Sequence, residues 1–375
     1  MKNQTTKSNY FRNMKETSRI AQTHLFLMLK DKIPNHIKND FHLFPNIRKE
    51  KIWARPWVIR MAYELGGGKD WRNFTKLGAI LELENISNYQ SNASFDFKYG
   101  VSEENDRMKQ IIVSFISRSL VQTFIEESID DKDLLLECLR LVNEIDFYNY
   151  LGQYNEFDKM NIKHFNLDMD YEEYFDVYLM RCYSYGGVWL KNILALGLLF
   201  SEDKNYDYLK VLQHFGKILG TGWMVLNDVT DYFIEAGEHG MNYKLSSDEF
   251  KDVWNGRITL PIFHALKTGN DFEVKFIFNI LNGRISKSNK NTSKLFEILL
   301  KRESLDFAYS IANYFRKRAK NIIKQIPLEK RHYLSIFADA IKSNKFVFEF
   351  RKHGLKVISI NSGIKKKLVQ FENET

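Results

Sequence analysis

The segment WMVLNDVTDYF, residues 223–233, places polar residues inside an otherwise apolar run. In a helix, Asn227 and Asp231 lie one turn apart on the same face, with Asp228 beside them. Carboxylate and amide oxygens are ligands that a hard cation such as Mg²⁺ accepts in proteins. Asn227 and Asp231 are therefore candidate metal ligands on one face of this helix.

A second polar interruption has the same spacing. The segment LGAILELENISNYQSNASFDFKYG, residues 77–100, has the pattern of an apolar helix and ends with Asn92 and Asp96, again four residues apart. Either pair alone is better explained by helix capping or exposure to water than by metal binding. Two pairs on separate long helices favour two facing walls of oxygen ligands, which would hold Mg²⁺ and a diphosphate between them.

The elements that must position these residues are helices. Leu135, Leu139 and Val142, for example, recur at helical spacing, whereas strand-like alternation is confined to VISI, residues 357–360. The class is therefore all-α, a large bundle whose helices are long enough to enclose a cavity. The predicted helices span residues 51–65, 74–92, 103–128, 132–157, 171–200, 205–233, 247–267, 272–281, 293–301, 304–325 and 329–348.

Charge and composition narrow the choice of partners. The chain has 375 residues, 44% of them hydrophobic, and a formal net charge of +8. Its basic residues are dispersed among acidic ones, and the basic run at 363–371 has the pattern of a solvated surface. We therefore expect no nucleic-acid partner, and an anionic small molecule suits the basic excess.

The cysteines and the termini give the expected compartment. Cys138 and Cys182 lie in apolar helical patterns without metal-binding spacing, which favours a reducing compartment. The longest apolar run, residues 186–200, is interrupted by Lys191 and too short to span a bilayer, so we expect no transmembrane segment. The first 19 residues lack an apolar signal region and are interpreted as a frayed arm. We expect a cytoplasmic protein, with targeting to an organelle as the alternative.

Several short motifs follow one another in an order that is specific as a series, although each is weak alone. They are GGGKDWR (66–72), NASFD (92–96), GQYNE (152–156), YLMRCYS (178–184), NDVTD (227–231), KLSSD (244–248) and GRITLPI (256–262). In this order, between about residues 55 and 350, the chain resembles the trans-isoprenyl diphosphate synthases, the polyprenyl synthetase family.

The resemblance implies an isoprenoid synthase-type helical bundle around a deep central cavity, Mg²⁺ as cofactor, and a homodimer. By position in the motifs, the residues that would bind the two diphosphate substrates are Lys69, Arg72, Asn85, Lys98, Gln153, Arg181, Lys244 and Arg257. Lys69, Arg72 and Asn85 match positions for the homoallylic diphosphate, and Arg181, Lys244 and Arg257 match positions for the allylic one. The implied metal ligands are Asn92, Asp96, Asn227, Asp228 and Asp231. The implied catalytic residues are Arg181, Lys244 and Trp223, the last forming an apolar wall with Met224.

The chain departs from the family pattern mainly at the aspartate motifs. Asn92 and Asn227 stand where an aspartate is usual, and Ala93 replaces the middle aspartate of the first motif. Both helices thus keep oxygen ligands but lose negative charge. Because an amide oxygen is a poorer Mg²⁺ ligand than a carboxylate, metal binding should depend more on the diphosphate itself.

These departures leave three functional hypotheses. The first is a prenyltransferase that couples an allylic diphosphate to isopentenyl diphosphate or a non-standard acceptor, which the retained Lys69, Arg72 and Asn85 favour. The second is a family-derived terpene cyclase, which ionises one prenyl diphosphate. The third is a catalytically weak regulatory subunit of a homologous synthase. The predicted organisation is an N-terminal arm and helix (1–50), a catalytic domain (51–350) and a basic C-terminal tail (351–375).

Overall fold

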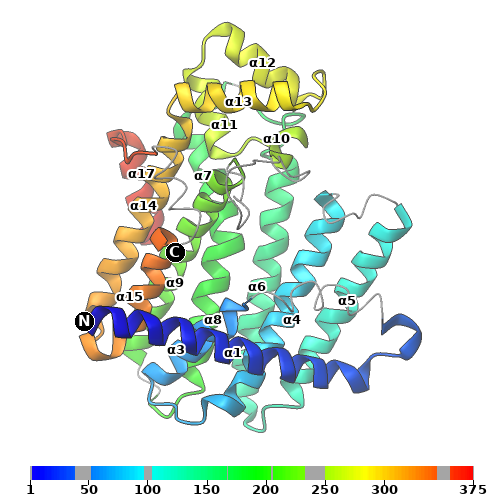
Figure 1. Ribbon diagram of the computed structural model, residues 1–375, viewed down its shortest axis with the longest axis vertical. Coiled ribbons are helices and arrows are strands. Elements are labelled where there is room, and N and C mark those ends of the chain that lie inside the picture. The colour runs from blue at the N-terminus through cyan, green and yellow to red at the C-terminus, as the bar shows by residue number, and fades with distance from the viewer. Residues whose placement is uncertain are drawn as a thin grey trace. The chain divides into compact units, whose positions relative to one another are not determined.

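The computed structural model describes residues 2–38, 52–96, 104–166, 168–203, 206–232, 250–343 and 355–374. Within these ranges every regular element is a helix (Figure 1), and extended residues pair only in an isolated antiparallel bridge between Asn161 and Arg257. The predicted all-α class is confirmed. None of the helices in these ranges has the length and apolar character needed to cross a membrane.

The first half of the chain forms the helices α1 (Lys2–Lys32), η1 (Asn35–Ile37), α3 (Ala54–Leu65), α4 (Trp71–Asp96), α5 (Glu104–Glu126), α6 (Lys132–Asp158), α7 (Tyr171–Cys182) and η2 (Tyr183–Gly187). The second half forms α8 (Val188–Leu199), α9 (Tyr206–Thr230), α10 (Lys251–Trp254), α11 (Leu260–Thr268), α12 (Asp271–Leu281), α13 (Asn289–Lys301), α14 (Ser304–Ile322), η3 (Ile323–Gln325), α15 (Leu328–Ser343) and α17 (Ser362–Glu374).

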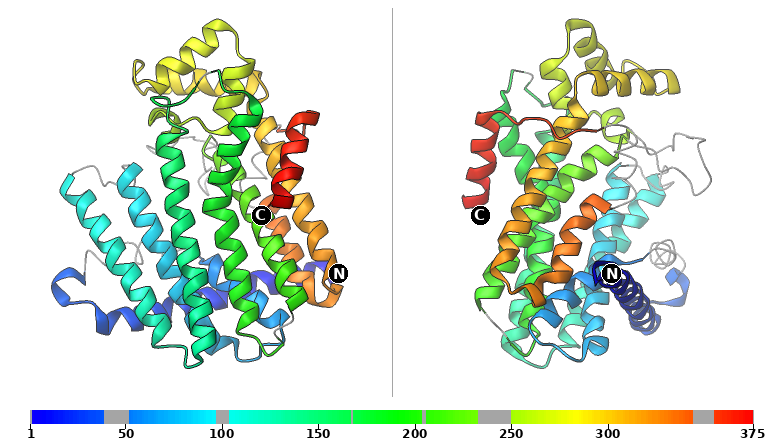
Figure 2. Two further views of the ribbon diagram at one scale, coloured as in Figure 1. Left: turned by 180° about the vertical axis from the view of Figure 1, so that it is seen from behind. Right: turned by 60° about the vertical axis from the view of Figure 1, so that its left-hand side comes forward.

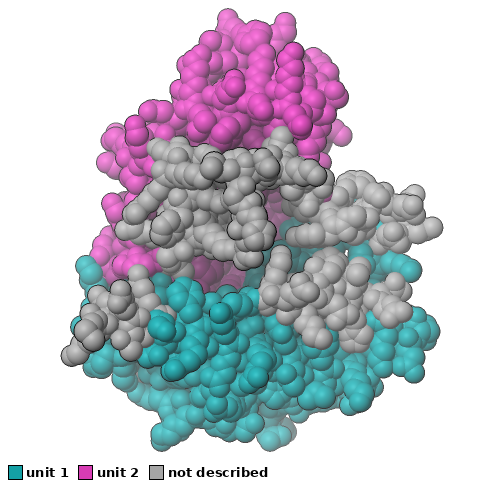
Figure 3. Space-filling view, viewed as in Figure 1, with its two compact units in different colours: residues 1–146, 191–213, 324–336 teal, residues 147–190, 214–323, 337–375 magenta. Residues whose placement is uncertain are grey.

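Internal contacts divide the chain into two compact units, which Figure 3 shows in different colours. Unit 1 comprises residues 1–146, 191–213 and 324–336, and unit 2 comprises residues 147–190, 214–323 and 337–375. Each unit draws on residues from distant parts of the sequence, and each is described here by itself.

The N-terminal helix α1 is a packed element of unit 1. Its buried residues, Tyr10, Thr17, Ala21, Leu25 and Leu29, recur at spacings of four or seven and form one face against α3 and α4. The expectation of a frayed arm is therefore wrong for this helix, because that face has apolar partners to cover it.

Helices α4 and α5 pack against each other in unit 1 through small polar side chains. The two helices run side by side in both views of Figure 2. Between them the Ser87 hydroxyl donates to the Ser114 carbonyl at 2.9 Å. Arg107 Nε likewise donates to the Ser94 carbonyl at 2.9 Å. Small side chains allow such close packing of the two helices.

Unit 2 contains a π-turn, η2 (Tyr183–Gly187), where the sequence predicts one continuous helix over 171–200. The π-turn packs against α9, and glycines allow the two backbones to come close. A Cβ on Gly220 of α9 would lie 2.1 Å from the Gly186 carbonyl oxygen. The backbones of η2 and α9 therefore touch directly. Insertions of this type are frequent at functional sites.

The predicted helix over 247–267 is wrong in one respect, because the chain turns between α10 and α11. Gly256 adopts a φ of +77°, and Thr259 is extended before Leu260 and Pro261 begin α11. Proline suits the first turn of a helix, where its missing N–H costs nothing. This turn carries Arg257.

The C-terminal segment is ordered rather than a loose tail. Residues 357–360 form no strand, and the Ile358 amide instead donates to the Ser310 hydroxyl at 2.8 Å. The helix α17 that follows buries Ile364 and Leu368 and packs against α7. Lys217 of α9, itself buried, donates to the last carbonyls of α17, with 2.8 Å to that of Phe371.

Glu273 connects α12 to α13 in unit 2. Its carboxylate accepts hydrogen bonds from the Asn270 amide at 3.1 Å, Lys301 Nζ at 2.9 Å and Arg302 Nε at 2.7 Å. Burial opposes its ionisation, but these donors prevail and lower its pKa to about 2. The cluster fixes the beginning of α12 against the end of α13.

Glu273→Gln is expected to lower the free energy of unfolding by about 2 kcal/mol at pH 7, because it removes the charge that these donors stabilise. The pKa in the folded protein lies below the ordinary value of 4.5, so this stabilisation is complete above that pH and is lost as the pH falls toward 2. Urea unfolding at pH 7 and pH 3 measures it, with the exposed Glu297→Gln as the control. A difference between Glu273→Gln and wild type that is equally large at both pH values would contradict this assignment.

Candidate functional site

The second aspartate motif lies at the end of α9, as the sequence predicts. Asn227 is exposed, Asp231 is partly exposed, and Asp228 between them is fully buried. The Asp231 amide donates to the Asn227 carbonyl at 3.1 Å, so the two residues are one helical turn apart. The motif therefore presents Asn227 and Asp231 outward and Asp228 to the protein interior.

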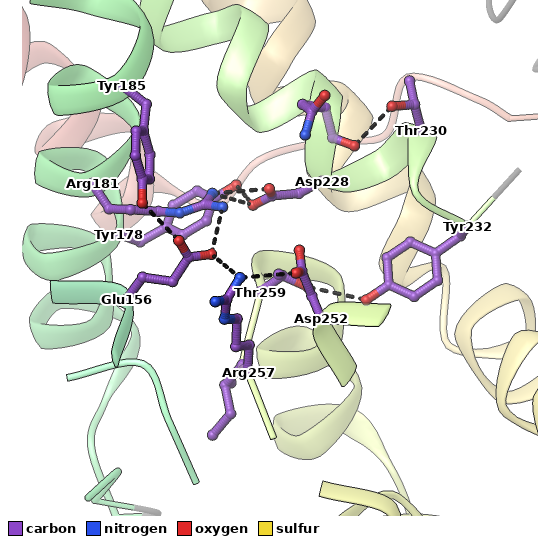
Figure 4. A network of polar contacts seen from close by, with 12 residues as sticks. Glu156, Tyr178, Arg181, Tyr185, Asp228, Thr230, Tyr232, Asp252, Arg257 and Thr259 are labelled. Atoms are coloured by element: carbon purple, nitrogen blue, oxygen red, sulfur yellow. Dashed lines mark hydrogen bonds and ion pairs between the residues drawn. The ribbon is translucent and has the colours of Figure 1, made fainter. Parts of the chain in front are cut away.

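Asp228 binds the guanidinium group of Arg181 on α7 (Figure 4). Arg181 Nη1 donates to both carboxylate oxygens of Asp228 at 2.9 Å, and the Tyr178 hydroxyl donates to Oδ2 at 2.8 Å. Tyr178 and Arg181 are three residues apart on α7 and so share a face. Both oxygens of Asp228 are thus engaged within the protein.

Glu156, near the end of α6, binds both arginines of this site. Its Oε1 atom accepts from Arg181 Nη2 at 3.1 Å and from Arg257 Nη1 at 3.2 Å, and its Oε2 atom accepts from the Tyr185 hydroxyl at 2.8 Å. Tyr185 belongs to the π-turn and lies one turn beyond Arg181. Residues of α6, α7, η2 and the turn before α11 therefore meet at this carboxylate, and α9 joins them through the contact of Asp228 with Arg181.

Arg257 also reaches Asp252 of α10, with 3.2 Å between Nη1 and Oδ1. Backbone hydrogen bonds of the residues before and after Arg257 fix its position. The Ile162 amide donates to the Gly256 carbonyl and the Ile258 amide to the Met160 carbonyl, each at 2.8 Å. We call Glu156, Arg181, Asp228, Asp252 and Arg257, with Tyr178 and Tyr185, the Glu156 cluster.

The Glu156 cluster contains three carboxylates and two guanidinium groups, which gives a formal charge of −1 when all are ionised. Burial raises the pKa of Asp228 to about 6, although Arg181 acts against it. Burial acts on Glu156 in the same direction, but Arg257 and Arg181 prevail and lower its pKa. The excess negative charge favours cations, so an anionic ligand would bind here best together with metal ions.

The first aspartate motif lies at the end of α4 in unit 1. Asn92 is partly exposed, and Asp96 is the last residue of the helix, with a side chain outside the described part of the structure. Asn85, two turns earlier, is buried, and its Nδ2 atom has no hydrogen-bond partner among the residues that the structure describes. Because Asn92 belongs to unit 1 and Asn227 to unit 2, their opposition across a cavity stays a prediction.

The cations of the predicted homoallylic site, Lys69 and Arg72, are both paired within unit 1. Lys69 Nζ lies 3.2 Å from Glu202 Oε2, and Arg72 Nη2 lies 2.8 Å from Glu16 Oε1 on α1. The Arg72 guanidinium also stacks on the Trp71 ring at 4.4 Å. The sequence analysis did not predict that both cations form ion pairs with glutamates distant in the chain, Glu202 and Glu16.

The remaining predicted residues are placed as follows. Gln153 is buried on α6, and Trp223 packs edge-on against Phe337 with 4.7 Å between ring centres. Lys98 and Lys244 lie outside the described residues. The assigned roles of these four residues stay predictions.

Three partners of the arginines escaped the sequence analysis. Glu156 stood in a quoted motif without a role, Asp252 stood in none, and Tyr185 lay just beyond the YLMRCYS motif. For Tyr178 and Tyr185 a signal existed, since both lie on the face of Arg181 at spacings of three and four. For Asp252 none existed, because its contact depends on the turn at Gly256.

The donor chemistry of α9 fits Mg²⁺ only in part. Asn227 and Asp231 supply hard oxygen atoms, but Asp228 is occupied by Arg181. Among the described residues no trio of His, Cys, Asp or Glu is arranged to hold a metal ion. A Mg²⁺ ion on this motif would therefore need further oxygen ligands from a bound diphosphate.

Comparisons with known proteins agree with this fold. The family described as Polyprenyl synthetase matches residues 104–299. Octaprenyl diphosphate synthase of Haemophilus influenzae is 28% identical over 120 residues, which cover 32% of this chain and 33% of that protein. Geranylgeranyl diphosphate synthase of Sulfolobus acidocaldarius is 23% identical over 164 residues, 43% of this chain and 47% of that protein. The chain thus spans between a third and a half of the length of these relatives.

Solved structures show the same all-α fold over longer stretches. Geranylgeranyl pyrophosphate synthetase from Pyrococcus horikoshii has a TM-score of 0.69 at 17% identity, covering 90% of this chain and 98% of the other. A polyprenyl synthase from Caulobacter crescentus, complexed with calcium and isoprenyl diphosphate, has a TM-score of 0.71 at 17% identity, covering 89% and 98%. The isoprenoid synthase-type bundle expected from the sequence is confirmed.

Glu156→Gln is expected to lower the free energy of unfolding by about 3–5 kcal/mol, because two buried guanidinium groups would lose their shared counter-charge. Urea unfolding measures this loss. The matched control is Tyr185→Phe, which removes only one hydrogen bond to the same carboxylate and should cost about 1 kcal/mol. Equal losses in the two variants would show that the charge of Glu156 contributes nothing to the cluster.

Proposed function

Because the chain belongs to the polyprenyl synthetase family, we propose that it is a Mg²⁺-dependent prenyltransferase. In this proposal it ionises an allylic isoprenyl diphosphate and couples the resulting allylic group to isopentenyl diphosphate or to another acceptor. Residues 51–350 would form the catalytic domain of a cytoplasmic enzyme.

The observation that carries the proposal is the Glu156 cluster. The family match includes Glu156, Arg181, Asp228 and Arg257, and these residues form one connected group beside the outward-facing Asn227 and Asp231. Fixed cations next to oxygen ligands for a metal are what a departing diphosphate requires.

Each part of the site has a chemical task in the proposed reaction. Mg²⁺, held by Asn227, Asp231 and the diphosphate, would neutralise the charge that develops on the leaving pyrophosphate. Arg181 would face that group from a fixed position, because Asp228 and Glu156 hold two edges of its guanidinium. A guanidinium that is already oriented needs little reorganisation as the charge develops.

The carbocation left behind must be kept from water among apolar and aromatic side chains. The Arg181 guanidinium lies 5.5 Å from the centre of the Tyr185 ring, and Trp223 with Phe337 adds a further aromatic pair in unit 2. These rings are the candidates for that wall.

A homodimer is part of the proposal. Met108, Ile112 and Phe115 recur at helical spacing on α5 and are 53%, 52% and 58% exposed. An exposed apolar helix face of this kind suits burial against a second copy of the chain.

A terpene cyclase is the second candidate, and one observation favours it. A cyclase needs no second diphosphate, and in unit 1 the cations Lys69 and Arg72 are already paired with Glu202 and Glu16. A cyclase would tolerate that pairing at no cost to its reaction.

Incubation of the purified protein with Mg²⁺ and allylic diphosphates of several lengths separates the candidates. We expect pyrophosphate release together with a longer prenyl diphosphate only when isopentenyl diphosphate is present. Release of a hydrocarbon or alcohol without isopentenyl diphosphate would establish the cyclase instead. No release under any condition would reject both and leave a regulatory subunit.

Asn227→Asp is expected to strengthen Mg²⁺ binding in the presence of pyrophosphate by about fivefold. The reason is that one added unit charge about 4 Å from a cation contributes at least about 1 kcal/mol. Asp231→Ala should abolish the metal-dependent reaction. Calorimetric titration with Mg²⁺, with and without pyrophosphate, measures the binding.

Asn282→Asp is the control, since it adds the same charge at the end of α12. Wild-type protein should bind Mg²⁺ appreciably only with pyrophosphate. Metal binding that is indifferent to changes at positions 227 and 231 would remove the second motif from the site.

A further inference from the structure

Lys69 lies in the loop before α4 and Arg72 in the first turn of α4, and the charges of both are compensated inside unit 1 before any ligand binds. Lys69 pairs with Glu202 at 3.2 Å and Arg72 with Glu16 at 2.8 Å. Asp70 lies between them and accepts a hydrogen bond from Asn73 Nδ2 at 2.6 Å. Lys69, Arg72, their two glutamate partners and Asp70 together have a formal charge of −1, where a diphosphate anion would need a positive one.

Glu16 is held in place by the residues that follow it on α1. Thr17 Oγ1 accepts from Arg60 Nη1 at 2.9 Å, and Ser18 Oγ accepts from the Trp53 amide at 2.7 Å, both in the interior. These two bonds fix the rotation of α1 about its axis, and with this rotation Glu16 points toward Arg72. The carboxylate is therefore built into the fold at this position.

Arg72 is fixed from its other side by an aromatic ring. The Trp71 ring contacts two guanidinium groups, that of the buried Arg60 at 3.3 Å and that of Arg72 at 4.4 Å. Arg60 Nε in turn donates to Glu64 Oε1 at 2.7 Å, which holds the Arg60 guanidinium against the Trp71 ring. Arg72 thus has a defined orientation toward Glu16, and stacking adds to the attraction.

Glu202 is placed by residues 201–203, which pack on Gly66. The Asp203 amide donates to the Gly66 carbonyl at 2.8 Å, and Ser201 lies so close that a Cβ on Gly66 would be 1.9 Å from its hydroxyl oxygen. Only a residue without a side chain fits here. This segment therefore holds Glu202 next to Lys69.

We propose that Glu16 and Glu202 are specificity-determining residues, which compete with a diphosphate for Arg72 and Lys69 and so weaken binding of the second substrate. This rests on the proposed function, since it takes these two cations as the site of the acceptor's diphosphate. Both pairs are largely exposed, with 64% of the Arg72 side chain and 83% of that of Lys69 accessible, so a ligand can displace the glutamates. The glutamates therefore weaken binding of a diphosphate to these two cations but do not prevent it.

The test measures binding of inorganic pyrophosphate without Mg²⁺ by calorimetry, which needs no catalysis. Glu16→Gln and Glu202→Gln should each tighten binding about threefold, and the double variant about tenfold, as expected for exposed ion pairs. The gain should shrink at high salt. Adding Arg72→Ala to the double variant should abolish it.

Glu127→Gln is the matched control, because it removes an exposed ion pair to Lys32 elsewhere in unit 1 and should change nothing. Unfolding midpoints of all variants establish that they fold, and the single variants carry the test if the double variant does not. Unchanged pyrophosphate affinity, or a gain that survives Arg72→Ala, would overturn the proposal.

Turnover distinguishes this inference from the proposed function. If the chain couples isopentenyl diphosphate, its KM in the double variant should fall about tenfold, in step with the pyrophosphate affinity, while the KM of the allylic substrate stays constant. A protein that shows the binding gain but no turnover retains the competition and loses the prenyltransferase assignment.

Discussion

One carboxylate oxygen, Oε1 of Glu156, accepts hydrogen bonds from two buried guanidinium groups, and the organisation of unit 2 depends on it. Without it, Arg181 and Arg257 would be like charges in an interior that screens them poorly. With it, α6, α7 and the turn before α11 are held together, and Arg181 links them to Asp228 on α9. The outward orientation of Asn227 and Asp231 follows, because Asp228 between them is drawn inward by Arg181.

Charge compensation is common to both groups of cations. In unit 2 the Glu156 cluster holds two arginines with three carboxylates, and in unit 1 Lys69 pairs with Glu202 and Arg72 with Glu16. The two groups differ in burial, which decides how each responds to an anion. The arginines of the cluster are buried and their positions are set, whereas Lys69 and Arg72 are exposed and their pairs are exchangeable.

Helix positions were predictable from the sequence where apolar residues recur at regular spacing, as in α6 and α14. The sequence failed where one residue changes the path of the backbone, as at Gly256 and in the π-turn. It identified Arg181 and Arg257 as diphosphate-binding residues but missed Asp252 and Glu16. The contact of Asp252 with Arg257 depends on the turn at Gly256, and Glu16 is 56 residues from Arg72 in the chain. Motif spacing describes neighbours on one helix, whereas charge balance depends on the tertiary fold.

The π-turn of Tyr183–Gly187 has a consequence for rotation along the chain. Each residue of an α-helix turns the backbone by about 100°. A π-turn holds about one residue more than an α-helical turn, so removing one residue here would convert η2 to ordinary α-helix without rotating the helix before it relative to the helix after it. Arg181 would still point toward Asp228. The extra residue is therefore absorbed within Tyr183–Gly187, and an alignment gap placed inside this segment keeps the arginines before it comparable.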